Sequence, residues 1–387
     1  MKKKSKTIWL VVLFSAFILL PLRAETQGLH ADRIVFGQSA CTTGPNAQVG
    51  LSYSKGIEVA FQEFNDGGGL SGKKLELIVL DDGYEPEQAA ANADRFVEKD
   101  DVLAVIGGVG TPTANRIAPI LRSANIPFIG HVTGADFLFD AARYPNVTNL
   151  RASYLDEVRT LVDHIVDELE EERIGIIYQD DAFGRAILRD LQQSLESHDL
   201  PLLAKSRFSR NTHAVHASLF EIGKADLDAI FLVGTYPAVA AIINLADSLD
   251  EDYTMASLSF SLSYELRNRI TRPHERLLHT EVMPSPVDDS SELAMKFRSA
   301  LQATGDDNHS FLNETALEGY LLGRFVISTL QRLGTDIERE TFARSLRSSS
   351  PVMIEDWVIE FEPDSNKGSE YVRLTTLVPL MKTKLQN

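Results

Sequence analysis

Short apolar runs alternate along the chain with longer segments in which apolar residues recur every three or four positions. The first runs predict strands at 33–40, 74–82, 102–108 and 126–131. The segment 47–66 places Val49, Tyr53, Ile57, Ala60 and Phe64 on one face and predicts a helix, with further helices near 86–99 and 112–124. Because these strands are apolar on both faces, we expect a parallel sheet that helices cover on both sides.

A second series of the same kind begins after "NLRASY" (149–154). It predicts helices at 154–170, 184–197, 213–223 and 237–248, and strands at 173–178, 201–206, 227–233 and 253–257. The tail adds helices near 290–303 and 312–333 and two strand-like runs, "PVMIEDWVIEFEP" and "YVRLTTLVPL". The pattern predicts an α/β protein of two doubly wound lobes that share a cleft.

Open α/β sheets bind ligands beyond the carboxyl ends of their strands. Here those ends read "SACTTGP", "GGVGTPT" and "GHVTGAD" in the first lobe and "YQDDAFG", "VGTYPA" and "ASLSFS" in the second. Their hydroxyl and aromatic residues suit a small polar ligand held between two lobes. Strand-to-helix loops are also rich in cap and turn residues without any ligand, but six such loops together favour a site.

The loop "GGVGTPT" (107–113) joins a predicted strand to a predicted helix and carries three glycines. Thr111 suits the N-cap and Pro112 the first helical position, so unpaired N–H groups there favour an anion. A dinucleotide-binding loop is excluded, because the pattern is G-x-G-x-x-T and the next strand ends at His131 rather than at an acidic residue. Two interpretations remain: a small-anion site that uses the Thr111 hydroxyl and the N–H groups of Thr113 and Ala114, or a tight turn without a ligand.

Other candidate chemistry has simpler explanations. Neither a G-x-x-x-x-G-K-[ST] phosphate loop nor a G-x-S-x-G nucleophile elbow occurs. His213 and His216 lie three apart on a predicted helix without an acidic partner, so we expect exposed residues rather than a metal site. Asp181 is expected to cap a helix, with Asp180 on the surface. We therefore expect no enzyme, no metal and no cofactor.

Composition and the first residues suggest where the protein works. The chain has 387 residues and a formal net charge of −17, which disfavours nucleic acid or an anionic membrane as a partner. Four lysines precede an apolar run from Ile8 to Leu20, and Ala24 follows. This predicts a signal peptide at 1–24 and a periplasmic protein beginning near Glu25, with an uncleaved anchor as the alternative. Cys41 is the only cysteine, so it forms no internal disulfide, and we expect it to be packed.

Several stretches resemble type I periplasmic binding proteins of the leucine/isoleucine/valine-binding family. The "TGP" after the first strand, "NDGGGLSGKKLEL" and "DDGYEP" have the family's spacing, and "IGGVGTPT", "RASY", "YQDDAFG" and "VGTYPA" continue the likeness. The resemblance implies two lobes joined by three crossovers. It places lobe 1 at 31–152 plus about 284–356, and lobe 2 at 153–283 plus about 357–387.

The resemblance also implies which residues bind the ligand. From the first lobe these are Gly110 and Thr111, which hold a carboxylate, and Val132, Thr133 and Gly134. From the second lobe they are Phe183, Tyr236 and Ser259. Two departures stand out: a first-lobe Tyr of some members falls at Val49, and the acid that pairs with an α-ammonium falls near Leu258–Ser259, where no carboxylate stands.

The function that the resemblance implies is capture of a small polar ligand, an amino acid or a small carboxylate or amide, and its delivery to an ABC importer. The expected partners are that small molecule and a permease complex in the inner membrane, and the protein is expected to be monomeric. The alternative is a periplasmic sensor that presents its closed form to a membrane signalling protein. Both functions need the same cleft.

Overall fold

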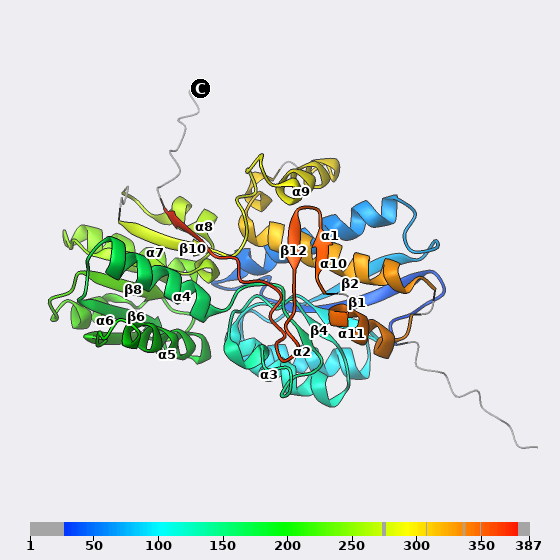
Figure 1. The fold of residues 1–387 in the computed structure, drawn as a ribbon, viewed down its shortest axis with the longest axis horizontal. Coiled ribbons are helices and arrows are strands. Elements are labelled where there is room, and N and C mark those ends of the chain that lie inside the picture. The colour runs from blue at the N-terminus through cyan, green and yellow to red at the C-terminus, as the bar shows by residue number, and fades with distance from the viewer. Residues whose placement is uncertain (1–26, 273–275, 307, 336, 349, 378–387) are drawn as a thin grey trace, which may run out of the picture.

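Two α/β lobes lie side by side and are joined by three chain crossovers (Figure 1). The computed structural model describes residues 27–272, 276–306, 308–335, 337–348 and 350–377 of the chain. The expected signal peptide and the last ten residues lie outside the described residues. The crossovers fall near residues 149–153, 282–290 and 368–372. The predicted fold class is confirmed.

The first lobe is built on a parallel sheet of strand order β2-β1-β3-β4-β5. Its strands are β1 (Arg33–Ala40), β2 (Lys74–Asp81), β3 (Ala104–Ile106), β4 (Phe128–Ile129) and β5 (Val147–Thr148). Its helices are α1 (Ala47–Asp66), α2 (Pro86–Glu98), α3 (Thr111–Ser123), α9 (Glu292–Ala303), α10 (Glu314–Leu333) and α11 (Arg339–Ser348).

Alternation along β1 explains how helices cover both faces of this sheet. Ile34 and Phe36 belong to the core that includes α1 and α10, whereas Val35 belongs to a separate core with α2 and α3. Successive strand residues point to opposite faces, so an unbroken apolar run serves two cores at once.

The second lobe repeats this topology, with strand order β7-β6-β8-β9-β10 and an added antiparallel strand β13 beside β10. Its strands are β6 (Ile174–Gln179), β7 (Ala204–Phe208), β8 (Ala229–Val233), β9 (Thr254–Ser257), β10 (Leu277–Glu281) and β13 (Arg373–Thr376). Its helices are α4 (Tyr154–Asp163), α5 (Ala182–Glu196), α6 (His216–Ile222), α7 (Tyr236–Ser248) and α8 (Ser263–Arg269).

The C-terminal segment stays with the first lobe longer than the expected boundary near 357. That boundary falls inside the hairpin of β11 (Val352–Ile354) and β12 (Trp357–Ile359). The Asn366 amide then donates to the carbonyls of Leu138 and Tyr144 in the first lobe. The chain enters the second sheet only at β13.

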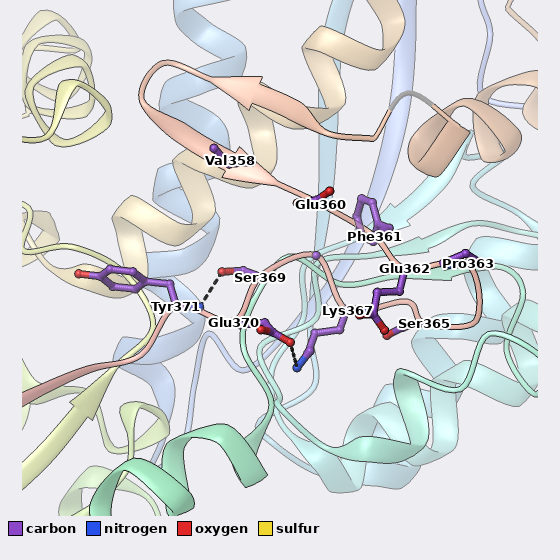
Figure 2. Close-up of a pocket in the computed structure, with 11 residues that line it drawn as sticks. Val358, Glu360, Phe361, Glu362, Pro363, Ser365, Lys367, Ser369, Glu370 and Tyr371 are labelled. Atoms are coloured by element: carbon purple, nitrogen blue, oxygen red, sulfur yellow. Dashed lines mark hydrogen bonds and ion pairs between the residues drawn. The ribbon is translucent and has the colours of Figure 1, made fainter. Parts of the chain in front are cut away.

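A surface hollow of about 680 Å³ lies along this third crossover (Figure 2). The crossover is attached to both lobes, because the Gly368 N–H donates to the Asn149 carbonyl at 2.8 Å and Lys367 pairs with Asp156, in the first turn of α4, at 3.0 Å. None of the site residues expected from the sequence lines this hollow.

Candidate functional site

The carboxyl ends of strands from both sheets meet at the boundary between the lobes. The rings of Tyr84, which follows β2, and Phe260, which follows β9, have centroids 5.9 Å apart. Since Tyr84 belongs to the first lobe and Phe260 to the second, the two lobes are in direct contact here.

Thr111 and Thr133 form a buried pair on the first-lobe side. Their hydroxyl oxygens lie 2.7 Å apart, and both residues are almost fully buried. Helix α3 begins at Thr111 with Gly110 as its N-cap, so Thr111 and Pro112 are each one position further into the helix than expected. The Ala114 N–H donates to the Gly110 carbonyl at 3.1 Å, so one of the two N–H groups assigned to an anion is already used.

Packing accounts for the glycines of "GGVGTPT". A Cβ on Gly110 would lie 2.2 Å from the Tyr84 ring, and one on Gly108 would lie 2.5 Å from the His131 imidazole. Both glycines have positive φ, of 96° and 122°. Burial lowers the pKa of His131 to about 4, so the neutral ring donates from Nε2 to the Gly110 carbonyl at 2.9 Å. The loop therefore lacks side chains where these two rings pack, whatever it binds.

Gly134 and Val132 hold the second loop of the first lobe in place. The Gly134 carbonyl accepts from the Tyr154 N–H at 2.8 Å, and a Cβ at Gly134 would come within 2.5 Å of that nitrogen. Val132 pairs with Val109 in an isolated parallel bridge and lines the cavity described below.

Four aromatic rings gather around the threonine pair. Phe183 lies 5.2 Å from Tyr154 and 4.6 Å from Phe260, and Tyr84 contacts Phe260 from the opposite lobe. Burial raises the pKa of Tyr154 to about 12. The Arg151 charge and the Thr133 and Thr111 hydroxyls oppose this rise but do not cancel it. Among the described residues, the buried hydroxyls of Tyr84 and Tyr154 have no hydrogen-bond partner of good geometry.

Tyr84 adds a strained backbone to this group, with φ of 64°. A bulky residue in the left-handed region is an outlier that surrounding structure must enforce. Two neighbours hold Tyr84 in this conformation. Gly110 has no Cβ and so leaves room for the Tyr84 ring, and the Arg210 guanidinium donates to the Tyr84 carbonyl at 2.6 Å.

Tyr236 occupies a different edge of the cleft. It is the first residue of α7, is 4% exposed, and lies under the Arg269 guanidinium at 4.9 Å. Its hydroxyl is beside the Gln48 backbone in α1, and burial raises its pKa. The described contacts bring Thr111, Thr133 and Phe183 together around Tyr154, but they place Tyr236 at the start of α1.

Carboxylates surround Ser259, although none is near it in sequence. Glu157 of α4 accepts from the Ser259 N–H at 2.9 Å and hydroxyl at 3.0 Å. Arg151 also donates to the Ser259 hydroxyl. The sequence has no carboxylate at Leu258–Ser259, but the fold brings the Glu157 carboxylate to Ser259 from 102 residues away.

Beside Ser259 lies an interlobe cavity of about 10 Å³, roughly the space that one water molecule needs. It is lined by Val49, Val132, Arg151, Ser259, Phe260, Glu281, Val282, Met283, Glu314, Thr315 and Glu318. A small organic ligand is much larger, so it enters only if the lobes separate.

The other candidate residues have the structural positions that we expected, as a helix cap, a buried thiol or exposed side chains. Asp181 caps α5 by accepting from the N–H groups of Phe183 and Gly184, and Asp180 pairs at the surface with Arg185 and Arg207. Cys41 is fully buried. His213 and His216 are exposed, but only His216 lies on α6, which begins there.

Sequence reasoning missed Tyr84, Arg151, Tyr154, Phe260 and the glutamates of the cavity. A signal was present for four of them: "DDGYEP" contains Tyr84, "RASY" contains Arg151 and Tyr154, and "ASLSFS" contains Phe260. No such signal was present for Glu281, Glu314 and Glu318, because they lie in β10 and α10 rather than in the strand-end loops named above. No described helix is long and apolar enough to cross a membrane.

This architecture is shared with known proteins, and part of the sequence is similar to theirs. A model of the periplasmic binding protein family matches residues 33–364. An amino acid binding protein of Pseudomonas aeruginosa is 24% identical over 242 residues, which cover 60% of this chain and 62% of that protein. The leucine-specific-binding protein of Salmonella typhimurium is 25% identical over 254 residues, 64% of each chain. The matches span less than two thirds of these relatives' own length.

Solved structures agree over a larger share of the chain. A possible leucine/isoleucine/valine-binding protein from Rhodopirellula baltica SH 1 is 29% identical with a TM-score of 0.82, covering 89% of this chain and 94% of that one. A substrate-binding periplasmic protein from Ralstonia solanacearum is 25% identical with a TM-score of 0.81, covering 89% and 99%.

Proposed function

Because the chain belongs to the periplasmic binding protein family, we propose that it captures a small polar ligand between its lobes and delivers it to an ABC importer. The ligand is an amino acid or a small carboxylate or amide. The names of the relatives, an amino acid binding protein and a leucine-specific-binding protein, support this class. Periplasmic location after removal of residues 1–24 belongs to the same proposal.

One observation carries the assignment of the site. The Thr111 and Thr133 hydroxyls lie beside the buried Tyr154 hydroxyl, which makes no hydrogen bond of good geometry within the described chain, and the rings of Phe183 and Phe260 stand near it. An unpaired buried polar group costs about 1–3 kcal/mol. A ligand carboxylate accepts from these hydroxyls while the rings cover its apolar part.

A thermal-shift screen of the purified protein against amino acids, small carboxylates and amides tests this function. A ligand at a hundred times its Kd should add about 2.7 kcal/mol to the free energy of unfolding. Small-angle scattering should then show a smaller radius of gyration with that ligand than without it. Stabilisation by none of these compounds, or identical scattering profiles at saturation, would contradict the proposal.

A further inference from the structure

A second group of side chains that can ligate a metal lies in the second lobe, away from the cleft. Asp163 is the last residue of α4, Asp167 lies in the π-helical turn His164–Glu168 that follows it, and His198 comes two residues after the end of α5. One oxygen of each aspartate and one ring nitrogen of His198 all lie within 4.8 Å of one another. Because α5 starts at the carboxyl end of β6 and runs back along the sheet, this group lies at the edge of the sheet opposite the cleft.

The His198 imidazole lies between the two carboxylates. Its Nε2 is 2.9 Å from Asp163 Oδ1, and its Nδ1 is 3.6 Å from Asp167 Oδ1. A neutral imidazole has one N–H and one lone pair, so only one of these nitrogens donates to its carboxylate. The other nitrogen directs a lone pair at an oxygen that carries negative charge. A cation at that position, either a second proton on the ring or a metal ion, removes this repulsion.

The two aspartates have few cationic neighbours. Six acidic residues occur in "DHIVDELEEE", which begins at Asp163. Among the contacts of the described residues, His198 is the only charge partner of Asp163 and Asp167. Arg159, one turn earlier on α4, acts instead on the buried Asp190 carboxyl. Negative charge of this kind attracts any cation, so the selectivity of a site here comes from the imidazole nitrogen.

His198 forms the inner wall of this group, and the aspartates form its solvent side. The His198 side chain is 17% exposed, against 61% for Asp163 and 60% for Asp167. The His198 N–H donates to the Leu195 carbonyl at 3.0 Å, which holds the turn after α5. Asp163 and Asp167 are four residues apart along a continuous helical segment, which places both carboxylates on one side of it. Water can therefore reach an ion here and complete its coordination.

We propose that His198 and Asp167 ligate a divalent transition-metal ion of the zinc class, and that Asp163 orients the imidazole. Imidazole nitrogen and carboxylate oxygen are common zinc ligands, whereas Mg²⁺ and Ca²⁺ take oxygen ligands. Two ligands about 2.1 Å from a tetrahedral ion lie about 3.4 Å apart, close to the 3.6 Å between Nδ1 and Asp167 Oδ1. Asp163 then accepts from Nε2–H at 2.9 Å, as a carboxylate beside a metal-bound histidine commonly does.

A bound ion connects the end of the α4 segment to the end of α5 and so stabilises the second lobe. It touches none of the residues assigned to the cleft, so metal binding is independent of the proposed function. The group also differs from His213 and His216, the histidines that the sequence drew attention to. Neither of them has an acidic partner among the described contacts, whereas His198 has two.

Calorimetry and thermal shift with zinc chloride test this site on the full chain, purified without a histidine tag and dialysed against EDTA. Zinc should bind with a stoichiometry of one ion and raise the melting temperature, and an excess of EDTA should reverse the rise. Magnesium chloride at the same concentration should change the melting temperature much less, because it lacks affinity for the nitrogen ligand.

Three isosteric variants then locate the ion. His198→Gln and Asp167→Asn should each weaken zinc binding at least tenfold, because each removes a ligand. Asp163→Asn should weaken it by about tenfold through loss of the oriented imidazole. His216→Gln is the matched control, since His216 is exposed on α6 of the same lobe, and its zinc affinity should stay within twofold of the native value.

The native protein decides the question even if a variant fails to fold. An absence of zinc binding would mean that the cation between the carboxylates is a proton and that His198 serves only as an ion-pair partner. Zinc binding that persists within twofold in His198→Gln would place the ion elsewhere on the chain. Either result overturns the metal site and leaves the proposed function untouched, because the ligand screen measures the cleft.

Discussion

At the scale of single residues, the Thr111–Thr133 hydroxyl pair is the part of the site that a substitution probes most directly. Thr111→Val keeps the side-chain shape and removes the hydroxyl that lies 2.7 Å from Thr133. A hydrogen bond to a charged ligand group typically contributes about 1.5–3 kcal/mol, so ligand Kd should rise at least tenfold. Calorimetry with the ligand found by the screen measures this change.

The same substitution should lower the stability of the ligand-free protein slightly. It leaves the buried Thr133 hydroxyl without this partner, and we expect a loss of about 1 kcal/mol in the free energy of unfolding. Asp180→Asn is the matched control, since Asp180 bonds only at the surface among the contacts described. Unchanged affinity in Thr111→Val would remove this pair from the site.

At the scale of elements, the turn between β3 and α3 depends on Gly110. Gly110→Ala would place a Cβ 2.2 Å from the Tyr84 ring and hold alanine at φ of 96°. Overpacking and a positive φ each cost about 1–3 kcal/mol, so we expect a loss of at least 2 kcal/mol in urea unfolding, together with weaker ligand binding.

Gly67→Ala is the control for that substitution. Gly67 follows α1 at φ of −74°, and a Cβ there would meet only ordinary contacts at 3.4 and 3.5 Å. Its stability should stay the same or rise by a few tenths of a kcal/mol. Equal stability of the two alanine variants would show that the Tyr84 ring moves aside at little cost and that the glycines of the loop have another cause.

At the scale of the whole molecule, Arg210 and Asn211 of the second lobe bind Tyr84 and Glu85 of the first lobe, a contact we call the clasp. Arg210 donates to the Tyr84 carbonyl and pairs with Glu85, which also accepts from Asn211 at 2.7 Å. Arg210→Ala removes contacts that exist only when the lobes meet. Because the pair is partly exposed, we expect ligand Kd to rise only about three- to tenfold, mainly through faster dissociation.

Stopped-flow dissociation measures that effect. Arg207→Ala is the matched control, because Arg207 is exposed and pairs with Asp180 inside the second lobe. An unchanged dissociation rate in Arg210→Ala would mean that the clasp does not hold the closed form.

Two acidic side chains meet across the lobes and should make stability depend on pH. Burial, and then repulsion from Asp136 of the first lobe, raises the pKa of Asp190 on α5 to about 7, with Asp156 adding to the repulsion and Arg159 and Arg189 opposing it. An unfolded Asp titrates near 3.9. Since the folded pKa is higher, the folded state binds more protons, and stability falls as pH rises from about 4 to about 7.

Asp190→Asn removes that titration and should therefore stabilise the protein at neutral pH. The gain in the free energy of unfolding should be about 1–2 kcal/mol at pH 8 and close to zero at pH 4. Urea unfolding at the two pH values measures it. An equal gain at both would show that shape, rather than charge, limits stability at Asp190.

The sequence by itself determined the architecture, the order of most of its elements and the loops at the cleft. Apolar runs and helical periodicity are local consequences of burial, so the parallel strands and their covering helices could be read directly. Helices α8 and α11 and the short strand β5 were not predicted. Strand β10 was missed as well, because "LLHTE" (277–281) mixes polar and apolar residues. Its His279 and Glu281 are nevertheless buried, in a strand that pairs with β9 and β13.

Tertiary structure alone decided which distant side chains meet. Arg151, Glu281 and Glu318 come from a crossover, a strand and a helix, yet they line one cavity. The glycines of "GGVGTPT" looked free for a ligand, but the rings of Tyr84 and His131 fill the space beside them. Local periodicity reports whether a residue is buried, whereas its partners depend on how the lobes pack, and the charge of the site depends on those partners.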